Sequence, residues 1–133
     1  MKRLLILLML VSQPAWAGWV PLATSGSGTD KAITHYWDPE TVRKTPNGRR
    51  AWIMTDYDQP QVKSFGTFQS TKMVNEIDCA GERVRNLQVA AFSGPIGTGE
   101  VVASDNSLGE WVFAGPGSIG EFQLQAICRV PLR

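Results

Sequence analysis

The sequence has few residues that commonly bind metals, with one histidine and two cysteines in 133 residues. A structural zinc site usually takes four ligands, so this supply is too small for the common zinc-binding architectures. An excess of charge of one sign is also missing, because 13 Lys and Arg against 12 Asp and Glu leave a formal net charge of +1. Nonspecific nucleic-acid binding needs a sustained basic field, so the composition predicts no nucleic-acid partner.

Long hydrophobic runs are absent as well. The apolar run from Leu4 to Val11 is far shorter than the roughly 20 residues of a spanning helix. Two basic residues precede it, and Ala-Trp-Ala at residues 15–17 follows as a small-x-small cleavage site. We predict a signal peptide over residues 1–17 and one domain over 18–133. We therefore expect an exported protein without a transmembrane segment, located in the periplasm, secreted or at the cell surface. Because no cysteine lies near the cleavage site, we expect that it is not a lipoprotein.

The two cysteines are Cys79 and Cys128. In an oxidising compartment outside the cytoplasm, we predict that they form a disulfide; two free thiols are the alternative. The bridge would close a loop of about 50 residues, for which the chain-entropy model gives about 4 kcal/mol.

Turn-forming residues are plentiful, with 13 Gly and 8 Pro. Such a composition is typical of short strands joined by turns. Alternating patterns predict strands over residues 19–24, 32–37, 51–57, 65–79, 84–92, 101–104 and 111–114. Asn47-Gly48 favours a hairpin turn, and Asp58-Gln59-Pro60 is expected to end the strand over 51–57.

A helix is predicted at the C-terminal end. Ser118 and Glu121 have the spacing of a capping box, which predicts a helix over residues 119–130. Apart from a narrow polar stripe, its circumference is apolar, with Gln123 the one interruption. Such a helix must be covered, and the apolar side of the strand over 65–79 is available. The predicted fold class is therefore α+β: a single antiparallel β-sheet of about six strands with a C-terminal helix packed on one face and tethered by a disulfide.

Residues with catalytic chemistry are sparse. His35 has the chemistry of a general base or haem ligand, but Ile33 and Trp37 flank it on the same strand face, which favours a packed histidine. Asp56 and Asp58 share a strand face, whereas a catalytic carboxylate pair must flank a cleft. The glycine-rich loop after the strand over 84–92 lacks the Lys-Ser or Lys-Thr of a phosphate loop. We therefore predict no enzyme activity, catalytic residue, metal or cofactor.

Lys72, Arg83 and Arg85 are the candidate partner-binding residues. If the strands beside them form a hairpin, the three cations come close enough to meet an acidic protein segment or a glycosaminoglycan. Glu76, Asp78 and a third acidic neighbour can equally neutralise them, which would leave a solvated face without a partner.

A series of short motifs runs through nearly all of the predicted mature chain. Ser70-Thr71-Lys72 precedes Asp78-Cys79, and then come Arg83-Val84-Arg85, Gly97-Thr98-Gly99, Trp111, Pro116-Gly117-Ser118 and Cys128. In this order the motifs resemble the surface-adhesin protein E family of Gram-negative bacteria. The resemblance implies an antiparallel sheet of about six strands with a C-terminal helix docked on its concave face by a disulfide. It also implies an adhesin that captures host extracellular-matrix and serum proteins. Unlike the lipid-anchored namesake, this leader lacks a lipidation cysteine.

The predicted function is therefore noncatalytic protein binding. Exposed strand edges offer backbone donors and acceptors for strand addition or for self-association as a homodimer. Two alternatives stay open: a periplasmic carrier of a small ligand such as haem, and a structural or accessory component of the envelope. The apolar helix argues against the carrier, because it should fill the concave side of the sheet.

Overall fold

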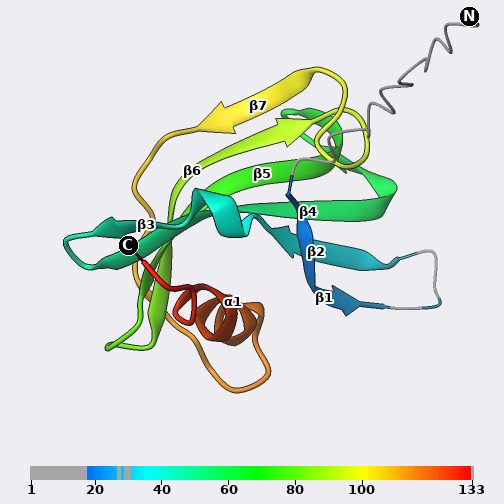
Figure 1. Ribbon diagram of the computed structural model, residues 1–133. Helices are drawn as coiled ribbons and strands as arrows, with labels where there is room; N and C mark the ends of the chain where they lie inside the picture. Colours follow the sequence, from blue (N-terminus) through cyan, green and yellow to red (C-terminus); the bar gives the residue numbers. More distant parts are fainter. Residues whose placement is uncertain (1–17, 27, 29–30, 133) are drawn as a thin grey trace, which may run out of the picture.

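The computed structural model describes residues 18–26, 28 and 31–132 (Figure 1). The predicted signal peptide, residues 1–17, lies outside the described residues. The described chain forms one antiparallel sheet in the order β1-β2-β4-β5-β6-β7, with β3 paired to β4 and β8 paired to β6. The elements are β1 (Val20–Ser25), β2 (Ile33–Trp37), the short 3-10 helix η1 (Pro39–Thr41), β3 (Arg43–Thr45), β4 (Gly48–Lys63), β5 (Gly66–Asp78), β6 (Arg83–Phe92), β7 (Val101–Asp105), β8 (Val112–Phe113) and α1 (Ile119–Ile127). The predicted fold class is confirmed, with β3 and β8 as additions to the six-strand path.

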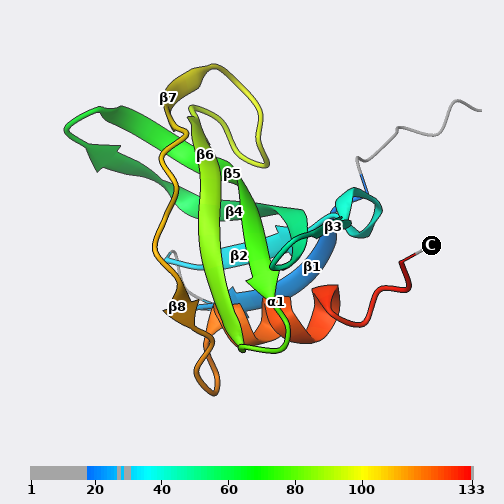
Figure 2. The same cartoon turned by 90° about the vertical axis from the view of Figure 1, so that its left-hand side faces the viewer.

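The long strands β4 and β5 form the centre of the sheet (Figure 2). The prediction that Asp58-Gln59-Pro60 ends the strand is wrong, because β4 continues to Lys63. The β4–β5 register is interrupted between Asp56 and Gln61 and then resumes. Pro60 lies inside this interruption, where its missing N–H removes no bond from the ladder.

Helix α1 lies across one face of the curled sheet (Figures 1 and 2). It begins as the capping motif predicts, with Ser118 Oγ accepting a hydrogen bond from the Glu121 amide at 3.2 Å. It ends at Ile127, before the predicted residue 130, and Cys128 is its C-cap. Ile127 and Ile77 are both 0% exposed and share one apolar core. No helix among the described residues has the length and apolarity to cross a membrane.

The polar interruption of the helix, Gln123, has a structural explanation. It is buried, and its Oε1 accepts a hydrogen bond from Asn75 Nδ2 on β5 at 2.9 Å. Asn75 Oδ1 in turn accepts from Asn86 Nδ2 on β6 at 3.1 Å. A buried amide without a partner would be costly, so this chain of amides fixes how α1 sits on β5 and β6.

Two further contacts fasten the C-terminal end of α1. Cys79 and Cys128 form the predicted disulfide, with their Cα atoms 6.0 Å apart. Arg49 on β4 donates from Nη1 to the carbonyl oxygens of Ile127, at 2.9 Å, and Val130. Ile127 is the last residue of the helix, and its carbonyl also accepts from the Val130 amide at 3.3 Å. Arg49 therefore fastens the end of the helix and the turn that follows it from another element.

Replacing both cysteines by serine (Cys79→Ser with Cys128→Ser) should lower the free energy of unfolding by about 4 kcal/mol, because the bridge restricts the unfolded chain over a long loop. Urea unfolding of residues 18–133 measures this, with the wild type in reductant as the matched comparison. A loss below about 1 kcal/mol in both samples would contradict the account.

Arg49→Gln should lower the free energy of unfolding by about 1.5–3 kcal/mol, because the helix end loses a charged donor. Lys63→Gln, at the exposed end of β4, is the control and should change it by less than about 0.5 kcal/mol. Equal losses in the two variants would show that Arg49 does not hold the helix end.

Candidate functional site

The sheet face opposite α1 carries a cluster of charged side chains from β5 and β6. Because neighbouring residues of a strand point to opposite faces, the burial of Ile77 beneath α1 directs Glu76 and Asp78 to the other face. The antiparallel register places Glu76 opposite Arg85 and Asp78 opposite Arg83. These four residues, together with Trp111, are called the arginine–tryptophan cluster below.

Both arginines of the cluster are bound twice. Arg85 forms an ion pair with Glu76 at 2.6 Å, and Arg83 forms one with Asp78 at 2.8 Å. The guanidinium groups of Arg83 and Arg85 also lie 4.5 and 4.4 Å from the centre of the Trp111 ring. Trp111 is half-buried and serves as a cation–π platform. Two carboxylates offset the repulsion between two cations that share one ring.

The cluster runs from a buried inner pair to an accessible outer pair. The side chain of Arg85 is 18% exposed and that of Glu76 is 5% exposed. The side chain of Arg83 is 44% exposed, while that of Asp78 is 15% exposed. Phe113 on β8 pairs directly with Arg83 and is 65% exposed. The outer end therefore presents a positioned guanidinium beside an exposed aromatic ring.

Hydrogen bonds keep both carboxylates of the cluster ionised. Burial alone would raise the pKa of Glu76, but hydrogen bonds from Thr45, Arg85 and Asn47, with the charge of Arg85, outweigh it and hold the pKa below its ordinary value of 4.5. Hydrogen bonds from Arg83 and the Gly81 amide hold the pKa of Asp78 below its ordinary 3.8. Both ion pairs are thus fully formed at neutral pH.

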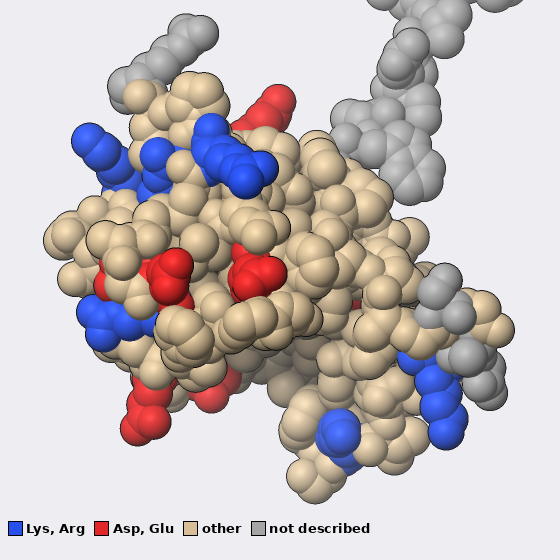
Figure 3. All heavy atoms as spheres, turned by 90° about the horizontal axis from the view of Figure 1, so that it is seen from below, with Lys and Arg blue, Asp and Glu red and all other residues tan. Residues whose placement is uncertain are grey.

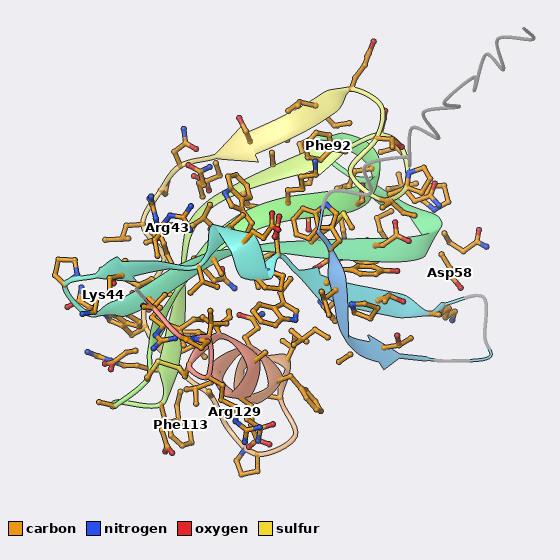
Figure 4. The ribbon with its side chains drawn as sticks, in the orientation of Figure 1. Arg43, Lys44, Asp58, Phe92, Phe113 and Arg129 are labelled. Atoms are coloured by element: carbon orange, nitrogen blue, oxygen red, sulfur yellow. A yellow bond between two sulfur atoms is a disulfide. The ribbon has the colours of Figure 1, made fainter. Side chains whose placement is uncertain are left out.

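The structure does not bring Lys72 to the two arginines. Lys72 pairs with Ala90 and lies six residues before Asp78 on β5, or about 20 Å along the strand. Its ammonium group is 5.2 Å from the Phe92 ring and 6.0 Å from the Trp19 ring. Phe92 and Phe113 lie at opposite ends of the sheet (Figure 4). The hairpin turn brings together only the residues nearest to it. The three predicted cations therefore lie at two separate sites, Arg83 and Arg85 beside Trp111 and Lys72 beside Phe92.

The other predicted candidates have structural surroundings. His35 Nδ1 lies 3.1 Å from Thr55 Oγ1, and burial lowers the pKa of the histidine. Asp56 Oδ1 accepts a hydrogen bond from the Ile96 amide at 2.7 Å and so anchors the glycine-rich loop. Asp58 lies beyond it on the exposed part of β4 (Figure 4). Within the described residues, no group of three or more His, Cys, Asp or Glu side chains is arranged to hold a metal ion.

Sequence reasoning missed the role of Trp111, and it named Glu76 and Asp78 as acids that can neutralise the cations without assigning each acid to its arginine. A signal was present for the two acids: Glu-x-Asp before the turn and Arg-x-Arg after it have matching spacing. A hairpin that pairs Asp78 with Arg83 must also pair Glu76 with Arg85. Trp111 reaches the cluster from a segment much later in the chain, and local spacing carries no signal for that contact.

Glu76→Gln should make stability less sensitive to acid. A carboxyl whose pKa is lower in the folded state contributes stability that is present above its unfolded pKa and is lost as pH falls through the folded pKa. The wild type should therefore lose stability more steeply than the variant between about pH 5 and pH 3. Urea unfolding across this range measures the slope. Glu100→Gln, at an exposed position outside the cluster, is the control and should retain the wild-type slope. If Glu76→Gln also retained the wild-type slope, the lowered pKa of Glu76 would be refuted.

Comparison with known proteins shows which family has this fold. Among curated proteins, no sequence matches. The structure of Haemophilus influenzae protein E superposes with a TM-score of 0.61 at 14% identity, over 84% of each chain. Its crystal form II gives a TM-score of 0.62 at 13% identity, over 84% of this chain and 87% of that one. Protein E from non-typeable Haemophilus influenzae gives 0.61 at 14%, over 84% of this chain and 76% of that one. These likenesses show the fold, and a model of surface-adhesin protein E matches residues 19–129. The chain therefore belongs to the surface-adhesin protein E family.

Proposed function

We propose that this protein is a noncatalytic adhesin domain that binds another protein through the outer end of the arginine–tryptophan cluster. The observation that carries the proposal is the Arg83 guanidinium, which is held between Asp78 and the Trp111 ring and is still 44% exposed. Membership of the family supports a surface adhesin role. The geometry supports binding through surface complementarity.

The outer end has the composition and order of a binding hot spot. Arginine and tryptophan are enriched among the residues that dominate interface energetics. Because Asp78 and Trp111 already hold Arg83 in one position, little side-chain entropy is lost when a partner binds. The exposed Phe113 on β8, which pairs with Arg83, adds apolar contact area beside the cation.

The proposed partners follow from the family. An exported adhesin meets proteins outside the cytoplasm, so host extracellular-matrix and serum proteins are the first candidates, provided that the predicted signal peptide directs export. β1 and β7 end the strand order of the described sheet, so an outer strand edge also offers a route to a homodimer. Surface proteolysis of intact cells distinguishes an adhesin from an accessory envelope component. A protein displayed on the surface is cleaved, whereas a periplasmic one is protected.

A second candidate function, carriage of a small ligand, is favoured by one observation. A cavity of about 340 Å³ remains between α1 and the sheet, with His35, Met73 and Gln123 among its lining residues. The volume is at the lower end of the range for small-molecule sites. A spectral titration with haem tests the carrier, and an unshifted Soret band removes haem as its ligand.

Arg83→Ala should weaken binding to the captured protein at least about tenfold, because it removes a positioned charged group from the proposed centre of contact. Residues 18–133 with the disulfide intact are offered to immobilised host matrix and serum proteins, and binding is measured by surface plasmon resonance. Arg129→Ala changes an exposed arginine just beyond α1; it is the matched control and should bind like the wild type (Figure 4).

Trp111→Ala tests the same site differently, since it retains both arginines and removes the ring that positions them. It should weaken binding in the same direction as Arg83→Ala. Unchanged binding in both variants, or absence of binding to every protein offered, would overturn the proposal.

A further inference from the structure

A second group of arginines shares the open face with the arginine–tryptophan cluster. Arg43 on β3 is directly opposite Arg50 on β4, Arg50 is opposite Glu76 on β5, and Glu76 is opposite Arg85 on β6. Residues directly opposite one another share a sheet face. Three guanidinium groups and one carboxylate therefore form a row across four strands. Arg43 and its neighbour Lys44 point to opposite sides of β3 (Figure 4).

One end of this row is not neutralised. The single carboxylate, Glu76, is taken by Arg85. Within the described part of the chain, neither Arg43 nor Arg50 forms an ion pair, and both are exposed. Like charges directly opposite on neighbouring strands are destabilising, and no ion pair among the described residues offsets this one.

The Arg43 side chain is nevertheless fixed in place. Its Nη1 donates to the carbonyl oxygens of Glu40 and Val42, each at 2.8 Å. The remaining donors of the guanidinium have no partner among the described residues. The carboxylate of Glu40 is the acidic group nearest in the chain, and it is not ion-paired with Arg43 or Arg50 within the described residues. The result is an ordered cation with free donors.

A cavity lies directly beside the arginine pair. It has a volume of about 330 Å³, and its lining includes Glu40, Arg43, Arg50, Trp52, Val74 and Leu87. Trp52 follows Arg50 by two residues on the same side of β4, which corresponds to about 6.7 Å along the strand. A partner segment in extended conformation also presents residues i and i+2 on one side. An acidic residue and an apolar residue at that spacing would reach the arginine pair and the cavity together.

We propose that this surface binds an extended acidic segment of a protein, with a carboxylate between Arg43 and Arg50 and an apolar side chain two positions away in the cavity beside Trp52. Charge complementarity selects the carboxylate, and arginine is suited to hold it through paired hydrogen bonds. A sulfated glycan or nucleic acid needs a continuous basic stripe, whereas Glu40 and Glu76 interrupt this one. The inference rests on the proposed function for the class of partner, and it adds a contact area with its own chemistry.

The test is an NMR titration of residues 18–133 with an acetylated serine-rich peptide that carries a glutamate and, two positions later, a leucine. Shifts are expected in the amides of β3 and β4. Matched peptides with glutamine for glutamate, or serine for leucine, should bind more weakly. Arg43→Gln combined with Arg50→Gln should weaken binding at least about tenfold, since it removes two charge-assisted contacts. The double variant Lys63→Gln with Arg129→Gln makes the same change in net charge away from the site and should bind like the wild type.

Three results would overturn the inference: equal binding of the glutamate and glutamine peptides, equal weakening by the two double variants, or binding of a heparin oligosaccharide at these residues without binding of the peptide. Arg43→Lys combined with Arg50→Lys retains both charges and the fold, and it should have intermediate affinity. Failure here is distinguishable from failure of the proposed function, because capture of a matrix protein that is lost with Arg83→Ala but unaffected by Arg43→Gln with Arg50→Gln would refute only this second contact.

Discussion

Burial of α1 against one face of the sheet is the interaction on which the rest of the structure depends. Ile127 from the helix and Ile77 from β5 are completely buried in the shared core. The disulfide, the buried amide chain and Arg49 all act at the same contact, so covalent, polar and apolar contributions hold one arrangement. A sheet covered on only one side leaves its other face to water and to partners.

Strand β5 takes part in both faces at once. Asn75 and Ile77 contact the helix side, while the alternate residues Glu76 and Asp78 hold the arginines. A shift of one residue in the register of β5 would exchange these sets, burying carboxylates under the helix. The disulfide at Cys79 comes directly after this segment and so opposes such a shift. The packing of the helix thereby determines the geometry of the candidate site.

Local patterns in the sequence were sufficient for much of the fold. Alternation identified most strands, Ser118 identified the start of the helix, and the export prediction led to the disulfide. They failed where the outcome depended on register. Pro60 looked like a strand end, and only an interruption in the pairing with β5 allows β4 to continue through it.

For the candidate site too, the sequence predicts the residues that are close to a turn, and it does not predict contacts that depend on strand register or on distant segments. Arg83 and Arg85 were found because they are close in sequence to the turn, but Lys72 was grouped with them without allowance for the length of an extended strand. The Asn47-Gly48 turn was recognised, although its consequence, that Arg43 must face Arg50, was not followed. Contacts such as Trp111 with the arginines join distant segments, and no local pattern encodes them.

The two areas of the open face differ in kind, although they share the row that contains Glu76. In the arginine–tryptophan cluster each cation already has a carboxylate, so a partner gains mainly from packing and from the remaining donors of Arg83. Arg43 and Arg50 have no ion-pair partner among the described residues, although Glu40 lies beside them and Glu76 is opposite Arg50, so a partner gains by supplying a carboxylate that pairs with them. Screening by salt acts strongly on exposed, uncompensated charge and weakly on packed aromatic surface. Contact through both areas would therefore combine an electrostatic term, which orients the partner, with an apolar term that persists at physiological ionic strength.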